Sequence, residues 1–207
     1  MDFLSAASFL GAAILLTLMP GPDNLFVLAQ SISNGKSAGI STAFGLCTGL
    51  VFHISAAAVG ISAVIYKSAL AFTFLKYAGA AYLLYLAYQS FRDKSSGFHI
   101  SDQHLVSLTS LYRKGIIMNL LNPKVSLFFL AFLPQFVNNE AGNVTIQMLM
   151  YGIIFLLQAL AVFTIISIFA GKAGEFLLRR PAIAKKINLI QGSLFAIIGL
   201  KMAFTQK

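Results

Sequence analysis

The chain has 207 residues, of which 58% are hydrophobic and only 10% are charged, and its mean hydropathy is +0.82. Soluble domains carry roughly 25% charged residues, so these values exclude a soluble core of this size. The net charge is +9, but the basic residues are spread between apolar segments, and no soluble region remains to bind nucleic acid. The composition therefore predicts a protein whose apolar surface faces the lipid of a membrane.

Six apolar segments long enough to cross a bilayer follow one another along the chain. They are expected at about residues 3–29, 38–65, 69–88, 116–136, 144–170 and 187–204. Prolines interrupt the first segment at Pro20-Gly21-Pro22 and the fourth at Asn122-Pro123. The predicted fold class is an all-α polytopic membrane protein with about six transmembrane helices, two of which are broken.

Lysine and arginine are concentrated in every second connection between these segments. Ten of the 15 basic residues lie in the first, third and fifth connections: Lys36, Arg92, Lys94, Arg113, Lys114, Lys172, Arg179, Arg180, Lys185 and Lys186. The positive-inside rule places these loops in the cytoplasm and both termini outside. One alternative stays open for the first segment: if it re-enters instead of spanning, the N-terminus is cytoplasmic.

The two halves of the chain resemble each other, since each begins with a proline-broken segment that two further segments follow. We expect one transmembrane domain over residues 1–207, with a first repeat at about 1–91 and a second at about 113–207. A cytoplasmic loop at about 92–112 would join them. An odd number of spans in each repeat turns the second repeat upside down, and such inverted repeats are common in secondary transporters.

The two proline breaks carry the candidate transport residues. Proline removes an amide donor, and backbone groups freed within a membrane need protein or cavity water as partners. Asp23 follows the first break and Lys124 the second. A carboxylate within a span is costly and faces a cavity or a partner. We predict that Asp23 and Lys124 approach each other to bind a zwitterion, Asp23 holding its ammonium and Lys124 its carboxylate. The alternative is an ion pair that only joins the halves.

Other polar residues lie close to these breaks in the sequence or face them across predicted spans. Asn24 and Asn122 flank the two charges, and their amides suit backbone groups that proline leaves unpaired. His53, in the second segment, titrates near neutral pH and suits proton coupling, although a neutral histidine bonded inside the bundle is the simpler interpretation. Gly45 and Gly49 form a GxxxG pattern that predicts close helix packing.

No cofactor or metal is expected. His99 and His104 lie in the one long loop, but no cysteine or clustered carboxylate completes a ligand set there. The sequence contains no phosphate-binding loop with Gly-Lys-Ser/Thr. Asp23 is the one clear carboxylate within a predicted span, so the paired catalytic groups of an intramembrane enzyme are missing.

Three elements together resemble a known family. They are Met19-Pro20-Gly21-Pro22-Asp23-Asn24, the run from Lys76 to Leu86, and Asn122-Pro123-Lys124. This combination is specific, covers essentially the whole chain and resembles the LysE/RhtB family of bacterial amino-acid exporters. One departure is Ala87, where many members have glycine after the Tyr-Leu-Leu run.

The resemblance implies export of amino acids or close derivatives across the bacterial cytoplasmic (inner) membrane, driven by ion gradients. Asn24 and the neutral surroundings favour the homoserine, threonine and neutral-amino-acid branch. We therefore expect a secondary transporter that works by proton antiport, with an amino acid, protons and lipid as its partners; homo-oligomer formation stays open. The alternative is a passive channel or facilitator for a small polar solute.

Overall fold

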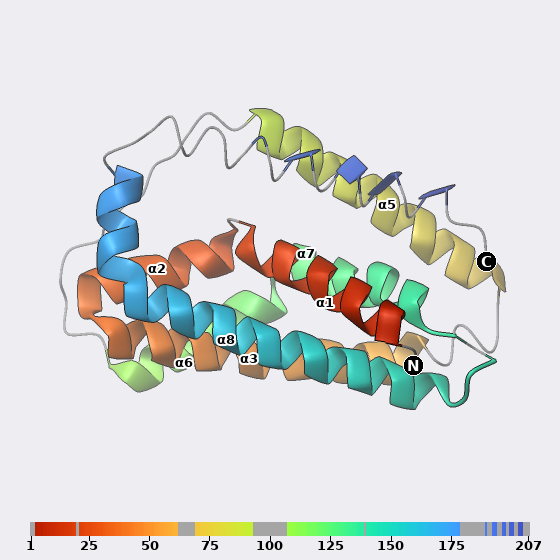
Figure 1. Cartoon of the computed structure of the whole chain (residues 1–207), viewed down its shortest axis with the longest axis horizontal. Coiled ribbons are helices and arrows are strands. Elements are labelled where there is room, and N and C mark those ends of the chain that lie inside the picture. The colour runs from red at the N-terminus through yellow and green to blue at the C-terminus, as the bar shows by residue number, and fades with distance from the viewer. Residues whose placement is uncertain are drawn as a thin grey trace.

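The computed structural model describes residues 3–19, 21–61, 69–92, 107–138 and 140–178, together with isolated residues between 189 and 204. Within this part of the chain, every regular element is a helix and none is a strand (Figure 1). The all-α prediction is confirmed. Half of the predicted sixth segment lies outside the described residues, as do both loop histidines.

Two of the predicted segments are bent at their prolines. At the first break α1 (Phe3–Leu18) meets α2 (Pro22–Asn34) at 57°. At the second, α6 (Leu108–Leu120) meets α7 (Pro123–Leu127), and the axis bends by 52°. Each second half begins with its proline, at the position where a helix needs no N–H group. The predicted broken helices are confirmed.

The remaining elements complete the bundle. They are α3 (Lys36–Ala56), η1 (Ala57–Ile61), α5 (Ala69–Arg92), η2 (Phe128–Phe132), η3 (Leu133–Phe136) and α8 (Val144–Leu178). Among the described residues, Lys36–Gly60 and Val144–Ala170 are each long and apolar enough to cross a membrane, and each bent pair qualifies if it counts as one span. With 24 residues, α5 is about 36 Å long, which also suffices for a bilayer core.

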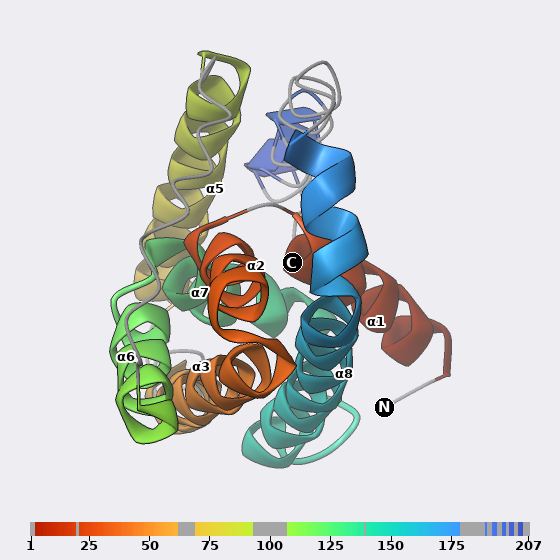
Figure 2. The same cartoon turned by 90° about the vertical axis from the view of Figure 1, so that its left-hand side faces the viewer.

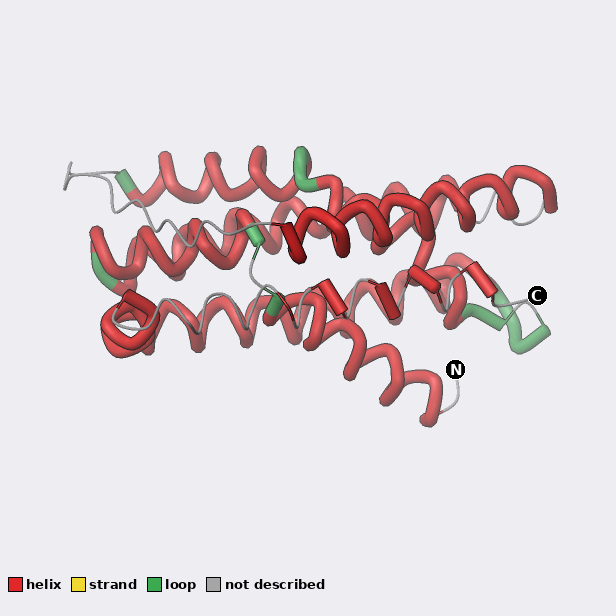
Figure 3. The backbone as a smooth tube through the Cα atoms, turned by 90° about the horizontal axis from the view of Figure 1, so that it is seen from above, coloured by secondary structure: helices red, strands yellow, loops and turns green. Residues whose placement is uncertain are grey.

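Successive segments run through the bundle in alternating directions (Figure 1). The bent pair of α1 and α2 leads from the end near the N-terminus to the opposite end, which is the course that a broken span follows. Each later segment reverses the direction, and the second group of three therefore starts from the opposite end to the first. Figure 3 shows this common axis from above, with α1 turned away from it. This order is the one that an inverted repeat requires.

Described residues of the sixth segment lie along α5. A Cβ atom on Gly199 would be 3.2 Å from the Ala80 carbonyl oxygen and the Leu83 side chain, while Gly192 lies against the Phe91 ring. Gly199 meets the earlier residues of α5 and Gly192 the later ones, so the two segments are antiparallel. Figure 1 shows the same arrangement.

Glycines bring α3 and α6 into backbone contact. A Cβ atom on Gly45 would collide with the Tyr112 carbonyl and would lie 3.1 Å from the Gly115 Cα atom. A Cβ atom on Gly49 would lie 2.7 Å from that of Asn119. The predicted GxxxG packing is confirmed, and α6 is its partner. In the end-on view, α2 packs against α3 and α8 on the other side (Figure 2).

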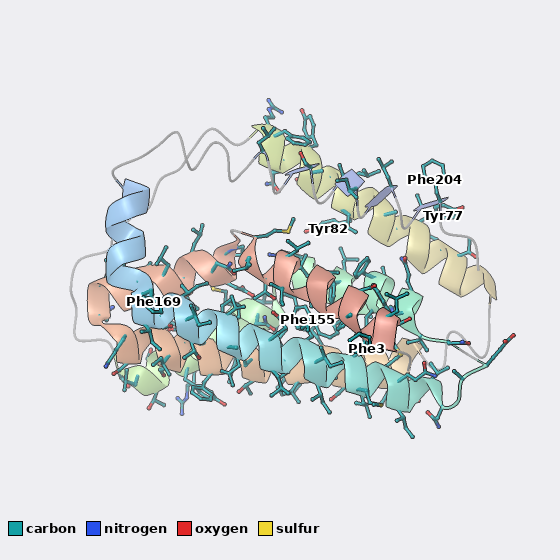
Figure 4. The ribbon with its side chains drawn as sticks, viewed as in Figure 1. Phe3, Tyr77, Tyr82, Phe155, Phe169 and Phe204 are labelled. Carbon is teal, nitrogen blue, oxygen red and sulfur yellow. The ribbon has the colours of Figure 1, made fainter. Side chains whose placement is uncertain are left out.

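The interior is aromatic and the exterior is apolar. Phe9 of α1 packs against Phe128, Phe136 and Tyr151, with ring centroids 4.8–5.9 Å apart. Large apolar side chains also cover the outside, as Figure 4 shows, and Phe3 there is 88% exposed. Such a surface is stable in lipid and aggregates in water.

One boundary differs from the prediction. The fourth segment begins at Leu108 and not near residue 116, so the connection predicted at about 92–112 is shorter. Arg113 and Lys114 suggested a loop, but both are exposed on the helix while Leu111 beside them is 1% exposed. Two charges on the outer face of a helix do not interrupt its buried face.

The α3–α6 contact gives a stability test. We expect Gly45→Ala to destabilise the folded protein by about 1–3 kcal/mol, because the new methyl group meets a backbone carbonyl that cannot turn away. The matched control is Gly11→Ala on α1, where a Cβ atom meets nothing within 4 Å. Thermal unfolding in detergent measures both variants, and equal melting temperatures would contradict the packing described.

Candidate functional site

The first break is held by side chains that bond the end of α1. The Asn24 amide donates from Nδ2 to the Thr17 carbonyl at 2.6 Å. From α8, Gln158 Nε2 donates to Thr17 Oγ1 at 2.8 Å. The Thr17 carbonyl lies four residues before Gly21, where the helix stops, so it has lost its usual partner in the next turn. Asn24 thus makes the hydrogen bond that its structural role requires.

The second break is held in a similar way. Asn122 Oδ1 accepts from the Lys124 backbone N–H at 3.0 Å and so caps α7. The carbonyl of Asn119 lies four residues before Pro123, which has no N–H to offer it. His53 Nε2 lies 3.1 Å from this carbonyl oxygen. Since a carbonyl only accepts, Nε2 is the donor, and His53 adds a second hydrogen bond to a carbonyl that also accepts from the Asn122 backbone N–H at 3.0 Å.

The charged residue that follows each break forms a hydrogen bond with a residue at the other break. The carboxylate of Asp23, at the start of α2, accepts at Oδ2 from Asn119 Nδ2 of α6 at 3.1 Å. The Lys124 ammonium, at the start of α7, donates to the Met19 carbonyl at the end of α1 at 3.3 Å. A carbonyl at a helix C-terminus carries partial negative charge and suits a cation. These two hydrogen bonds join the broken spans at their breaks. We call the place formed by Asp23, Asn119, Lys124 and Met19 the crossing.

Asp23 and Lys124 both reach this crossing, and their charges attract each other. The hydrogen bonds described for them go to Asn119 and Met19, the Asn122 side chain also interacts with the Asp23 carboxylate, and no ion pair between Asp23 and Lys124 appears among the described contacts. A direct salt bridge between Asp23 and Lys124, which would join the two halves, is thus not formed in this conformation. The expectation that the two charges meet at the repeat interface holds for their positions, while their roles in binding stay a prediction.

Three buried side-chain oxygens at or near the breaks have no hydrogen-bond partner in the described structure. They are Asp23 Oδ1, Asn119 Oδ1 and Gln158 Oε1. Their side chains are 6%, 1% and 8% exposed. An unpartnered buried polar atom costs about 1–3 kcal/mol. All three atoms are acceptors, so the crossing is arranged for a group that donates hydrogen bonds.

The comparisons with known proteins agree with this architecture. The family model described as LysE type translocator matches residues 14–206. This chain belongs to that family. It is 32% identical to an uncharacterized membrane protein of Vibrio cholerae, with 98% of each chain covered. It is also 32% identical to the homoserine/homoserine lactone efflux protein of Salmonella typhimurium, over 95% of this chain and 94% of that one. No solved structure matches.

The family membership confirms the resemblance seen in the sequence and places the chain among membrane translocators. A translocator moves a solute across a membrane. In the described ranges, no group of three histidine, cysteine, aspartate or glutamate side chains is placed to hold a metal ion.

The translocator brings its predicted site residues together at the breaks. Asp23, Asn24, Asn122, Lys124 and His53 all bond there, from α2, α3 and the turn into α7. Pro20 lies outside the described residues; Gly21 and Pro22 form the turn into α2, and Pro123 begins α7.

Asn119 and Thr17 were missed by the sequence analysis. A signal for Asn119 was present, because it is the polar residue four positions before Pro123, which cannot donate an N–H to its carbonyl. No comparable signal marked Thr17, whose contact with Gln158 depends on how α8 crosses α1.

The His53 contact can be tested by keeping or removing its donor. We expect His53→Phe to lower the unfolding free energy by about 0.5–1.5 kcal/mol, because the Asn119 carbonyl loses one of its two donors and keeps the Asn122 N–H. His53→Gln carries an N–H donor and should lose much less. Thermal unfolding of the two variants in detergent measures the difference, and a Phe variant as stable as the Gln variant would show that the donor is dispensable.

Proposed function

We propose that this translocator exports amino acids or close derivatives from the cytoplasm, as a secondary transporter coupled to inward proton movement. One observation carries the proposal: Asp23, a carboxylate only 6% exposed, lies at the crossing of two broken spans with one oxygen unpartnered. Buried ionisable groups within membranes mark transport pathways. Relatives named for homoserine and homoserine lactone efflux, 31–32% identical, support the same substrate class.

The charges at the crossing match a zwitterion with a neutral side chain. Asp23 supplies one negative charge for an ammonium group. Lys124 supplies one positive charge for a carboxylate once its ammonium leaves the Met19 carbonyl. A substrate with a charged side chain would need a further counter-charge, and Asp23 and Lys124 are the charges that the described contacts bring to the breaks. This supports the neutral-amino-acid branch over the basic one.

Proton coupling follows from competition for the same carboxylate. A proton and a substrate ammonium cannot both neutralise Asp23, so a proton that arrives from outside displaces the substrate there. Asn119 links His53 to Asp23: its backbone carbonyl bonds His53, and its side-chain amide bonds Asp23. His53 is a second titratable group on this route. Both features support antiport with one site used in turn.

We further propose that the translocator lies in the bacterial cytoplasmic membrane with both termini outside. The start of α3, the end of α5 and the start of α6 lie at the end of the bundle opposite the N-terminus (Figure 1). Lys36 begins α3, Arg92 ends α5, and Arg113 and Lys114 lie in the first half of α6, all four exposed. Basic residues near the ends of spans favour the cytoplasmic side. Substrate would then enter from the end marked by these four residues.

The test is efflux from proteoliposomes preloaded with a panel of amino acids, with an imposed proton gradient. We expect saturable, selective efflux that a protonophore abolishes, and a loss of roughly tenfold or more in Asp23→Asn, because the amide has no charge for an ammonium. Glu140→Gln is the matched control. It removes an exposed carboxylate from the connection between η3 and α8 and should transport normally.

The outcomes separate the alternatives. Downhill efflux without accumulation against a gradient would indicate a channel or facilitator. Selective efflux that survives in folded Asp23→Asn would keep the exporter but move its site. No efflux of any amino acid by folded, inserted protein would contradict the proposed function.

A further inference from the structure

Asn119 and Asp23 present a matched pair of buried acceptors. The bond from Asn119 Nδ2 to Asp23 Oδ2, 3.1 Å long, ties one atom of each side chain to the other. It leaves Oδ1 of each without a partner, although Asn119 is 1% and Asp23 6% exposed. The two free acceptors belong to side chains in direct contact, one from α6 and one from α2. Each free acceptor is therefore the second polar atom of a side-chain group that takes part in the same hydrogen bond, where α2 meets α6.

The backbone of α3 holds the Asn119 amide in place. A Cβ atom on Gly49 would lie 2.7 Å from Asn119 Cβ and 2.8 Å from its Oδ1, so only glycine leaves room for this amide. One turn further along α3, His53 bonds the Asn119 carbonyl. Asn119 is thus fixed by α3 at both its main chain and its side chain, in the way that preorganised binding groups are supported.

The chemistry of the pair selects its ligand. One acceptor is a carboxylate oxygen and the other an amide oxygen, and the nearby Lys124 ammonium is engaged with the Met19 carbonyl. A primary ammonium group carries a positive charge and three N–H donors, enough for both acceptors. An N-acyl amine has no charge, and a quaternary ammonium has no donor. Each would leave a buried acceptor unpaired, and recognition sites of this kind reject such analogues strongly.

We infer that Asp23 Oδ1 and Asn119 Oδ1 together form the subsite for the primary ammonium group of the substrate. Asn119 is then a binding residue that determines specificity for unmodified amines. The inference rests on the proposed function, because it assigns one part of the same site. It adds a residue from the second repeat to a carboxylate from the first, so the ammonium group is bound across the repeat interface.

Binding to purified protein tests the subsite without requiring transport. The twenty amino acids and homoserine are screened by thermal stabilisation in detergent, and each ligand that stabilises is titrated beside its N-acetyl and N-trimethyl forms. We expect the parent amino acid to bind wild type at least about tenfold more tightly than either derivative. Equal affinity for the N-trimethyl or N-acetyl form would overturn the inference, and so would the absence of any ligand in the panel.

Variants then separate Asn119 from Asp23. Asn119→Leu and the smaller Asn119→Ala should raise the dissociation constant of the parent amino acid by roughly tenfold, since one acceptor of a charged donor is lost. The matched control is Gln147→Leu, which removes another buried amide, one that bonds Asn138 in the connection between η3 and α8. Its affinity should stay within about twofold of wild type even if it melts at a lower temperature.

Affinity that is unchanged in both folded Asn119 variants would show that the amide is only structural. If neither variant folds, the titrations of the N-substituted ligands against wild type decide the inference alone. Efflux is measured separately in proteoliposomes. A protein that binds primary ammonium as described but exports nothing would contradict the proposed function and leave the subsite standing.

Discussion

The site depends on one constraint: a backbone carbonyl within a membrane must have a hydrogen-bond donor. Two spans are interrupted by proline, and each interruption leaves carbonyls without their helical partners. The Thr17 and Met19 carbonyls accept from side-chain donors, and the Asn119 carbonyl accepts from a side chain as well as from the Asn122 backbone N–H. Those side-chain donors are the amide of Asn24, the ammonium of Lys124 and the imidazole of His53. Polar residues are thus gathered at mid-bundle because the breaks need them, and they become available there for transport.

Close packing determines how near these groups come. Gly45, Gly49 and Gly115 let the backbones of α3 and α6 touch, and Asn119 fits against α3 only because residue 49 has no side chain. An aromatic cluster around Phe9 and Phe128 packs α1 and η2 against α8. The polar crossing therefore lies between tightly packed apolar layers, where electrostatic interactions are stronger than in water. A single buried carboxylate can dominate such a site.

The two repeats share a plan but not a chemistry. Each has a half-helix that starts with proline and a polar side chain from a later span that bonds the half-helix before the break: His53 of α3 and Gln158 of α8. The residue after each proline carries opposite charge in the two halves. An inverted repeat with identical halves would place like charges at the crossing, where they would repel each other. The difference between Asp23 and Lys124 gives the crossing one charge of each sign, which is what the proposed zwitterionic substrate requires.

The sequence by itself determined the membrane class, the broken spans, the alternating charge of the connections and the residues Asp23, Asn24, Asn122, Lys124 and His53 as candidates. These follow from composition and from the backbone chemistry of proline, which act locally along the chain. Only the tertiary structure decided the partners: Asn119 for Asp23, Met19 for Lys124, and α6 for the glycines of α3. It also moved the start of the fourth segment to Leu108. Contacts between residues about a hundred positions apart depend on how helices pack, and hydropathy does not encode that geometry.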